Sequence, residues 1–248
     1  MGILNVTPDS FADGGRHNEF EAAVARGIEM IAEGVDIIDV GGESTRPGAE
    51  RVSEEEEIAR TIPVIAELAK HGATISIDTM RASTAEAAIK AGAAIINDVS
   101  GGLADDAMLQ TAARLKVPYI AMHWRGQSKD MNSKAIYGDV VNDVIAELNE
   151  RIDAALDAGI QKDKLIIDPG IGFAKDAEHN WAIIDAIDRF VELGYPVLVG
   201  ASRKRFLGGD TPDEREQATI DLTKRLGTTG VWAVRVHSVK PHKEVLSS

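Results

Sequence analysis

The chain has 248 residues, no cysteine, and 40 Asp and Glu against 27 Lys and Arg, which gives a net charge of −13. The lack of cysteine excludes disulfides, thiolate metal sites and a cysteine nucleophile. The negative charge disfavours nonspecific binding to nucleic acid or an anionic membrane surface, so an anionic substrate must meet a local basic cluster. No apolar run approaches the ~18 residues of a membrane span, and no signal-peptide pattern follows Met1. We therefore expect a soluble, cytoplasmic protein.

A short apolar run that ends on a polar residue recurs along the chain. Consecutive aliphatic residues without alternation favour parallel strands that helices bury on both faces. The run that ends at Asp168 is the clearest, because Pro169 and Gly170 take the chain out of the sheet directly after the carboxylate. Eight such runs occupy residues 2–5, 37–42, 75–78, 95–98, 119–123, 165–168, 197–202 and 234–237.

Helical patterns follow these runs. The spacing of Phe20, Val24, Ile28 and Ile31 predicts a first helix that buries all four side chains and ends near Gly34.

Capping signals predict where later helices begin. Residues 53–56 and 83–86 both read Ser-x-x-Glu, the pattern of a capping box, and the glutamates at 54–57 are expected in a solvated first turn. Thr211 followed by Pro212 predicts the start of the seventh helix. Further helices are expected within 105–115, from after Tyr137 to about 158, over 177–193 and from about 241 to 248.

Eight β-then-α units in succession predict an α/β protein, a single closed (β/α)₈ barrel of the TIM type over residues 1–248. The alternative is a doubly wound open sheet, but the G-x-G-x-x-G fingerprint expected after its first strand is absent. A barrel closes through its first and last strands. Little sequence precedes the first strand and the eighth helix is short, so both could weaken closure.

The carboxyl ends of all strands in a barrel face one mouth. Acceptors there, at Asp78, Asn97 and Asp168, suit a planar heterocycle with several N–H donors. Cations suit the oxygens of phosphate or carboxylate groups. A structural ion pair is the simpler interpretation of any one such residue. The convergence of many polar strand ends on one mouth, however, favours a binding site. The expected polar residues are Asn5, Asp39, Asp78, Asn97, His123, Asp168, Lys204, Arg235 and His237, and the cationic set adds Arg46 and Arg203.

Motifs spread over the whole chain resemble those of the dihydropteroate synthase family, and they occur in the family's order. They are GILNVTPDSF at 2–11, DVGGESTRPG at 39–48, SIDT at 76–79, NDVSGG at 97–102, DPGIGF at 168–173, SRK at 202–204 and RVH at 235–237. The resemblance implies condensation of 6-hydroxymethyl-7,8-dihydropterin diphosphate with p-aminobenzoate, which gives 7,8-dihydropteroate and pyrophosphate in folate biosynthesis.

The family's residue roles, carried onto the matching positions, imply three subsites and one metal. The pterin would contact Asp78, Asn97, Met122, Asp168, Phe173 and Lys204. The diphosphate would contact Asn5, Arg46, Arg235 and His237, with Asn5 also binding Mg²⁺. The aminobenzoate would contact Phe11, Thr45, Arg46, Pro47, Ser202 and Lys204. The catalytic groups would be Asp78, Lys204, Arg235 and His237, which favour an SN1-like loss of pyrophosphate.

Two other functions fit parts of the pattern. Corrinoid-dependent methyltetrahydrofolate methyltransferases resemble this pterin pocket, but they need no diphosphate clamp such as Lys204, Arg235 and His237. An inactive paralogue that binds pterin without turnover is the other alternative. We expect His123 to be a hydrogen-bond donor behind the site rather than a metal ligand, because no other His or Cys lies at ligand spacing. The resemblance also implies a homodimer.

Overall fold

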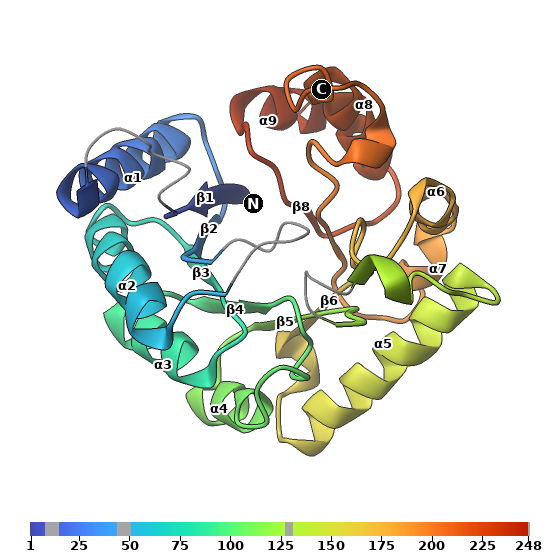
Figure 1. Cartoon of the computed structure of the whole chain (residues 1–248), viewed down its shortest axis with the longest axis horizontal. Coiled ribbons are helices and arrows are strands. Elements are labelled where there is room, and N and C mark those ends of the chain that lie inside the picture. The colour runs from blue at the N-terminus through green and yellow to red at the C-terminus, as the bar shows by residue number, and fades with distance from the viewer. Residues whose placement is uncertain (8–14, 44–50, 127–130, 248) are drawn as a thin grey trace.

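Strands and helices alternate along the chain in a computed structural model that describes residues 1–7, 15–43, 51–126 and 131–247. The strands are β1 (Gly2–Asn5), β2 (Ile38–Gly41), β3 (Ile75–Asp78), β4 (Ile95–Asp98), β5 (Tyr119–Met122), β6 (Leu165–Asp168), β7 (Leu198–Val199) and β8 (Ala233–Val234). The helices are α1 (Gly15–Ala32), α2 (Glu54–Lys70), α3 (Ala82–Ala91), α4 (Met108–Leu115), α5 (Val140–Asp157), α6 (Ala177–Asp185), α7 (Ile187–Val191), α8 (Glu216–Leu226) and α9 (Lys240–Leu246). Short 3-10 helices lie at Met131–Lys134, Lys162–Lys164 and Arg205–Leu207. The helices form an outer ring around the strands (Figure 1).

The strands form a closed ring of parallel neighbours. β1 to β6 pair in chain order, and β7 pairs with β8. Single parallel bridges join the two sheets at both edges, between Ile167 and Val197 and between Gly2 and Val236. The second junction is secured by backbone hydrogen bonds from Ile3 N to Val236 O (2.8 Å) and from Val236 N to Met1 O (2.9 Å). The short first strand therefore closes the (β/α)₈ barrel, as the strand and helix pattern predicted.

The alternation of side chains along each strand divides the core into two parts. A large cluster lies between the strands and the helices and includes Ile38, Val40 and Ile77. A small apolar cluster is separate from it and comes from Met1, Ile37, Ile95, Ile120, Ile166 and Leu198. Because these residues alternate with the helix-facing ones, they fill the inside of the barrel. The residues two positions further along β2, β4, β5 and β6 share this inner face, above the apolar floor.

Two predicted helix starts differ from the observed ones. Helix α3 begins at Ala82, whose backbone N–H donates to Asp105 Oδ2 at 2.8 Å, so a carboxylate from a distant loop replaces the predicted box at 83–86. Helix α8 begins at Glu216, because the hydroxyl of Thr211 caps only the turn before it, accepting from Glu214 N at 3.3 Å. The cap of α2 is confirmed, since Ser53 Oγ accepts from the backbone N–H of Glu56 at 3.2 Å.

Three predictions about side chains and helix continuity were also wrong. Ile28 is 40% exposed rather than buried. Glu57 is not part of a solvated turn, because it is 1% exposed and pairs with Arg81 from the loop after β3. The helix predicted over 177–193 breaks at Ala186, and Ile187 begins a second short helix that packs into the core.

Candidate active site

The polar strand residues converge inside the barrel because they share the inner face with its apolar floor. Asp39, Asn97, Met122 and Asp168 each lie two residues after a member of that floor, and all four are at most 5% exposed. Their strands are neighbours or near neighbours in the ring, with Gly41 opposite Asp78 and Asp78 opposite Asn97. The alternation that builds the barrel thus also builds the site.

An ion cluster joins β8 to β2 and β3 across the closed ring. Arg235 Nε lies 2.6 Å from Asp39 Oδ2, and Arg235 Nη2 lies 2.6 Å from Asp78 Oδ2. Asn97 Nδ2 donates to the same Asp39 oxygen at 3.0 Å. Burial raises the pKa of Asp78 to about 7, against the opposing charge of Arg235. The guanidinium and acceptors expected in separate sets are therefore in direct contact.

The turn after β6 presents Asp168 at the inner rim. Gly170 N donates to Asp168 Oδ1 at 2.7 Å, and Gly170 has a left-handed φ of +69°. A Cβ on Gly170 would lie 2.4 Å from the carbonyl oxygen of His123, so only glycine fits there. Burial raises the pKa of Asp168, while Gly170 N–H and the charge of Lys204 lower it.

Lys204 extends across this turn from the loop after β7. Its Nζ donates to the carbonyl oxygen of Ile171 and lies 4.5 Å from the centroid of the Phe173 ring. Burial lowers the pKa of Lys204 to about 8, although the charge of Asp168 opposes the shift. The structure thus brings together Asp168, Phe173 and Lys204, three residues expected around the pterin.

The loops after β7 and β8 carry a hydroxyl and an imidazole in contact. Ser202 Oγ lies 2.9 Å from His237 Nδ1, and His237 N donates to Ser202 Oγ at 3.3 Å. Asn5 is half-buried at the end of β1. Its amide oxygen and Asp78 Oδ2 lie at equal distances, 3.6 Å, from the position that a Cβ on Gly41 would occupy. Asn5 and Asp78 therefore face the same space.

Some expected residues lie elsewhere. Arg203 is drawn away by Glu216 of α8, whose Oε2 lies 2.6 Å from Arg203 Nε. His123 lies on the helix side of β5 and contacts Glu147 of α5, so it does not reach the mouth; as predicted, it lies behind the site. The predicted contacts Phe11, Thr45, Arg46 and Pro47 lie outside the described residues.

Sequence reasoning placed Asp39 at the mouth without naming its partners, and it did not single out Lys175. Asp39 accepts hydrogen bonds from both Arg235 and Asn97. Its position two residues after Ile37, on the inner face of the strand, is a signal that could have indicated an inward-facing carboxylate. Lys175 is 8% exposed beneath the turn after β6, and nothing local in the sequence distinguishes it from a surface lysine. Among the described residues, no cluster of three His, Cys, Asp or Glu side chains could hold a metal.

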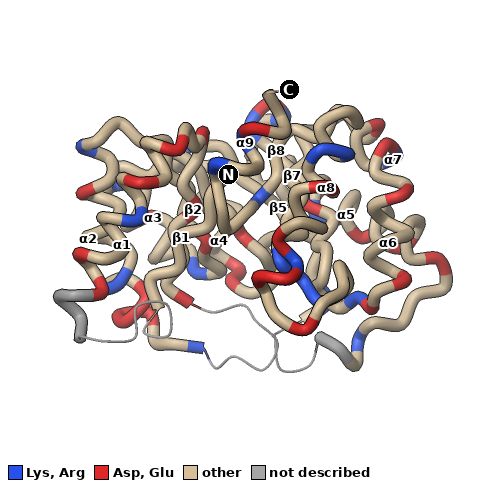
Figure 2. Tube along the Cα trace, turned by 90° about the horizontal axis from the view of Figure 1, so that it is seen from above, with Lys and Arg blue, Asp and Glu red and all other residues tan. Residues whose placement is uncertain are grey.

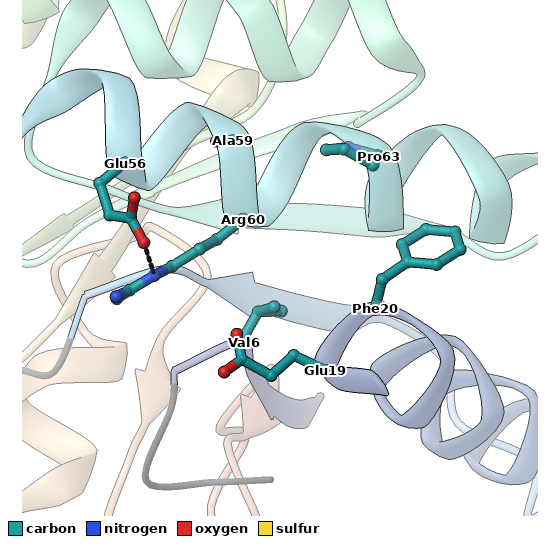
Figure 3. Close-up of a pocket in the computed structure, with 7 residues that line it drawn as sticks. All are labelled: Val6, Glu19, Phe20, Glu56, Ala59, Arg60 and Pro63. Atoms are coloured by element: carbon teal, nitrogen blue, oxygen red, sulfur yellow. Dashed lines mark hydrogen bonds and ion pairs between the residues drawn. The ribbon is translucent and has the colours of Figure 1, made fainter. Parts of the chain in front are cut away.

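A separate pocket of about 340 Å³ lies between α1 and α2. Figure 3 shows its lining from both helices, with Val6 at the end of β1 and the ion pair of Arg60 with Glu56 on one wall. Arg60 also donates to Gly42 O at 3.0 Å. None of the predicted site residues lines this pocket, and two of its charged groups, Arg60 and Glu56, pair with each other.

The acceptors, cations and apolar floor inside one barrel have the character expected of a site for a planar, donor-rich heterocycle with an anionic group. The sequence family described as pterin binding enzyme matches residues 1–237. The chain therefore belongs to the pterin-binding enzymes. A dihydropteroate synthase of Mycobacterium leprae is 48% identical over 256 residues, covering 99% of this chain and 90% of the relative.

Solved structures give the same result. A Xanthomonas albilineans dihydropteroate synthase with 4-aminobenzoic acid matches with a TM-score of 0.94 and 44% identity, over 100% of this chain and 90% of that one. The enzyme from the same organism in complex with 7,8-dihydropteroate matches with a TM-score of 0.90 and 40% identity, over the same shares. The chain belongs to the dihydropteroate synthases, which are transferases.

Proposed function

We propose that this enzyme transfers the 7,8-dihydropterin-6-ylmethyl group from its diphosphate to p-aminobenzoate, forming 7,8-dihydropteroate and releasing pyrophosphate. The observation that carries the proposal is the pairing of acceptors and cations above one apolar floor: Asp78, Asn97 and Asp168 with Lys204 and Arg235. A neutral heterocycle needs the first set and a diphosphate needs the second.

The pterin is proposed to bind flat against the inner strand ends. Its amino and ring N–H groups donate to Asp168 and Asp78, and Asn97 supplies an amide. Met122 and Phe173 form apolar contacts, and Lys204 donates to the pterin carbonyl side. Burial strengthens each of these hydrogen bonds, because water competes poorly inside the barrel.

The diphosphate is proposed to lie against Arg235, His237 and Arg46. Asn5 is proposed to hold Mg²⁺ through its neutral amide oxygen, since this oxygen and Asp78 Oδ2 each lie 3.6 Å from the position of a Cβ on Gly41, and the substrate's own oxygens would complete the site. When bound, the ion would supply positive charge to the diphosphate oxygens. The aminobenzoate is proposed to contact Ser202 and Lys204 together with Phe11, Thr45, Arg46 and Pro47.

The chemistry is proposed to be dissociative. The bond between the pterin methylene carbon and the diphosphate oxygen breaks, and both electrons leave with pyrophosphate. Arg235 and His237 stabilise the departing oxygens, while Asp168 and Asp78 stabilise the cation delocalised over the pterin. The amine nitrogen of p-aminobenzoate then attacks the methylene carbon and releases a proton to solvent. No general base of unusual pKa is required.

A pyrophosphate-release assay tests this function. Pyrophosphate should appear stoichiometrically with dihydropteroate when both substrates are present, and slowly or not at all without p-aminobenzoate. Release that ignores p-aminobenzoate, or pterin binding with no release, would contradict the proposal; the second result would indicate an inactive paralogue. Methyl transfer from methyltetrahydrofolate to a corrinoid would instead support the methyltransferase alternative.

Two further properties complete the proposal. No helix in the described part of the chain is long and apolar enough to cross a membrane. We propose a cytoplasmic location, where substrate and product of folate biosynthesis would meet the enzyme.

We also propose a homodimer through the final helices, supported by the half-exposed Leu246 at the end of α9. Light scattering on the purified chain would test the dimer.

A further inference from the structure

A buried lysine that the proposed mechanism does not use lies beneath the turn after β6. Lys175 Nζ is within hydrogen-bonding distance of three acceptors: His123 Nδ1 at 2.9 Å, Gly170 O at 3.0 Å and Phe173 O at 3.1 Å. An ammonium group has three donors and no acceptor. Each donor therefore has one partner, which is the arrangement expected for a charged lysine.

The imidazole of His123 links this ammonium to α5. Because Nδ1 accepts from Lys175, the ring proton lies on Nε2, which donates to Glu147 Oε2 at 2.9 Å. Burial lowers the pKa of His123 to about 4, so the ring is neutral near pH 7. Arg125 holds the other side of Glu147, with Nε 3.1 Å from Oε1. A continuous polar chain thus runs from Arg125 to the turn.

The turn itself adopts a costly backbone conformation. Gly170, Gly172 and Ala174 have φ values of +69°, +76° and +47°, and the last of these is unfavourable for a residue with a side chain. Such a conformation persists only when its surroundings fix it. Lys175 holds two carbonyls of the turn, and Tyr137 donates from its hydroxyl to Ala174 O at 3.0 Å.

The same turn carries two residues of the proposed pterin subsite. Asp168 begins it, with Oδ1 bound to Gly170 N, and Phe173 lies near its end, with its ring near Lys204. The two carbonyls held by Lys175 belong to Gly170 and Phe173. A displacement of either carbonyl therefore moves a group that would contact the pterin.

We propose that Lys175 is a positioning residue for the pterin subsite: its ammonium fixes the turn and so orients the Asp168 carboxylate and the Phe173 ring. This inference rests on the proposed function, because it assigns the pterin to that turn. Lys175 acts through these residues and does not itself touch the substrate.

The protonation of Lys175 gives the proposal a pH signature. Burial lowers the pKa of Lys175 to about 7, opposed by Asp168 and reinforced by Lys204 and Arg125. Glu147 and neutral His123 also face it from α5 and β5. A neutral amine has two donors, so one of the three acceptors loses its hydrogen bond when the ammonium loses a proton as the pH rises through about 7. This loss should raise the KM for the pterin diphosphate over this range, whereas ionisation of Asp78 should lower it, so the contribution of Lys175 is measured as the ratio of variant to wild-type KM.

The test compares Lys175→Met with Lys224→Met, an exposed control on α8, in the full-length enzyme. KM for each substrate, kcat and melting temperature are measured at about pH 6.5 and about pH 8.5, on either side of the Lys175 pKa. At the lower pH, Lys175→Met should raise the pterin KM by about tenfold, the scale of a small misplacement, and leave the aminobenzoate KM within about twofold. The ratio of its pterin KM to the wild-type KM should be smaller at the higher pH, where the wild-type lysine is also uncharged.

Either of two results would overturn the proposal. One is that Lys175→Met has the wild-type pterin KM at both pH values and shows only a lower melting temperature or a smaller fraction of active protein. The other is an aminobenzoate KM that rises as much as the pterin KM. The wild-type assay run alongside tests the proposed function separately, because wild-type enzyme that forms no dihydropteroate refutes that function whatever the variants do.

A second variant keeps the test decisive should Lys175→Met fail to fold. His123→Leu removes one acceptor and leaves the two carbonyls, so the ammonium is less stable and should lose its proton at lower pH. The rise in the pterin KM should then begin at a lower pH than in the wild type. A rise that begins at the wild-type pH would contradict the proposal.

Discussion

At the scale of single residues, the site depends on a few buried groups of fixed hydrogen-bonding character. Asp168 accepts from Gly170 N with one oxygen, and the second oxygen of a carboxylate can accept from a ligand donor. A carboxylate offers only acceptors there, whereas the amide of asparagine would present an N–H to a heterocycle that offers N–H groups. The identity of this side chain, more than its volume, should therefore decide pterin affinity.

Asp168→Asn should weaken pterin binding by ~2–5 kcal/mol, the usual cost of losing one partner in a buried charged hydrogen bond. Isothermal titration with a 6-hydroxymethylpterin measures it, and circular dichroism checks that the variant is folded. Wild-type affinity in the variant would remove Asp168 from the pterin subsite.

Lys204→Ala should lower kcat by roughly 10²–10³, the scale for losing one preorganised donor at a developing charge. Lys224→Ala on the exposed face of α8 is the matched control and should behave as the wild type. Steady-state kinetics measure both, and the melting temperature of the Lys204 variant should change little. Normal turnover in this variant would place Lys204 at the rim, outside the chemistry.

The pKa of Asp78, raised by burial to about 7, predicts an acidic limb in the pH profile. Above this pKa the carboxylate accepts hydrogen bonds from the pterin and pairs with Arg235. As the pH falls through about 7, protonation replaces an acceptor with a donor, so kcat/KM should fall with it. Asp78→Asn should lower activity and flatten this limb. An acidic limb that persists unchanged in Asp78→Asn would have to come from another group.

At the scale of elements, strand alternation explains why much of the site could be predicted. Asn97, Met122 and Asp168 lie at strand ends on the inner face, and both properties follow from local sequence. The contact of Arg235 with Asp39 could not be predicted, because it depends on ring closure between residues 196 apart. The same holds for Glu57: its sequence neighbours indicate an exposed first turn, and its burial comes from Arg81 of another element.

Arg81 and Glu57 form a buried connection between α2 and the start of α3. Arg81 Nη1 contacts Glu57 Oε2 and lies 2.8 Å from Glu43 Oε2, and Thr84 Oγ1 donates to Glu57 Oε2 at 3.2 Å. Removing one member of a buried ion pair leaves the other charge only partly compensated. This penalty commonly exceeds what the intact pair contributes.

Glu57→Ala should therefore lower the free energy of unfolding by about 3 kcal/mol. Glu55→Ala, two residues earlier in the same first turn and exposed, should change it by no more than about 0.5 kcal/mol. Urea denaturation followed by circular dichroism measures both variants. Equal stability of the two would mean that Glu43 alone satisfies Arg81.

At the scale of the whole molecule, a chain of net charge −13 must bind two anionic substrates. Figure 2 shows acidic positions along the outer helices, whereas Arg235, Lys204 and His237 gather inside or at the rim of the barrel. The local cations must dominate the potential at the mouth for a diphosphate to enter. Their present partners are protein groups, so each ligand has to displace an existing contact.

This exchange of partners should couple the two substrates. Of the expected aminobenzoate contacts, the described part of the chain includes Ser202 and Lys204, and both are engaged: Ser202 with His237, and Lys204 with the carbonyl of Ile171. Diphosphate at His237 and pterin at Lys204 would redirect these groups. An aminobenzoate mimic should therefore bind well only after the diphosphate and the pterin have bound.

A sulfonamide titrated calorimetrically should bind at least about tenfold more tightly with pyrophosphate, Mg²⁺ and a pterin present than without them, a coupling of roughly 1.4 kcal/mol. Because linkage is reciprocal, the sulfonamide should tighten pyrophosphate binding by the same factor. Ser202→Ala removes the hydroxyl that contacts His237 and should reduce the coupling more than it reduces pterin affinity. Equal sulfonamide affinity in both conditions would mean that the aminobenzoate subsite is already formed before the pterin and the diphosphate bind. The contacts of Ser202 and Lys204 would then not limit access to that subsite.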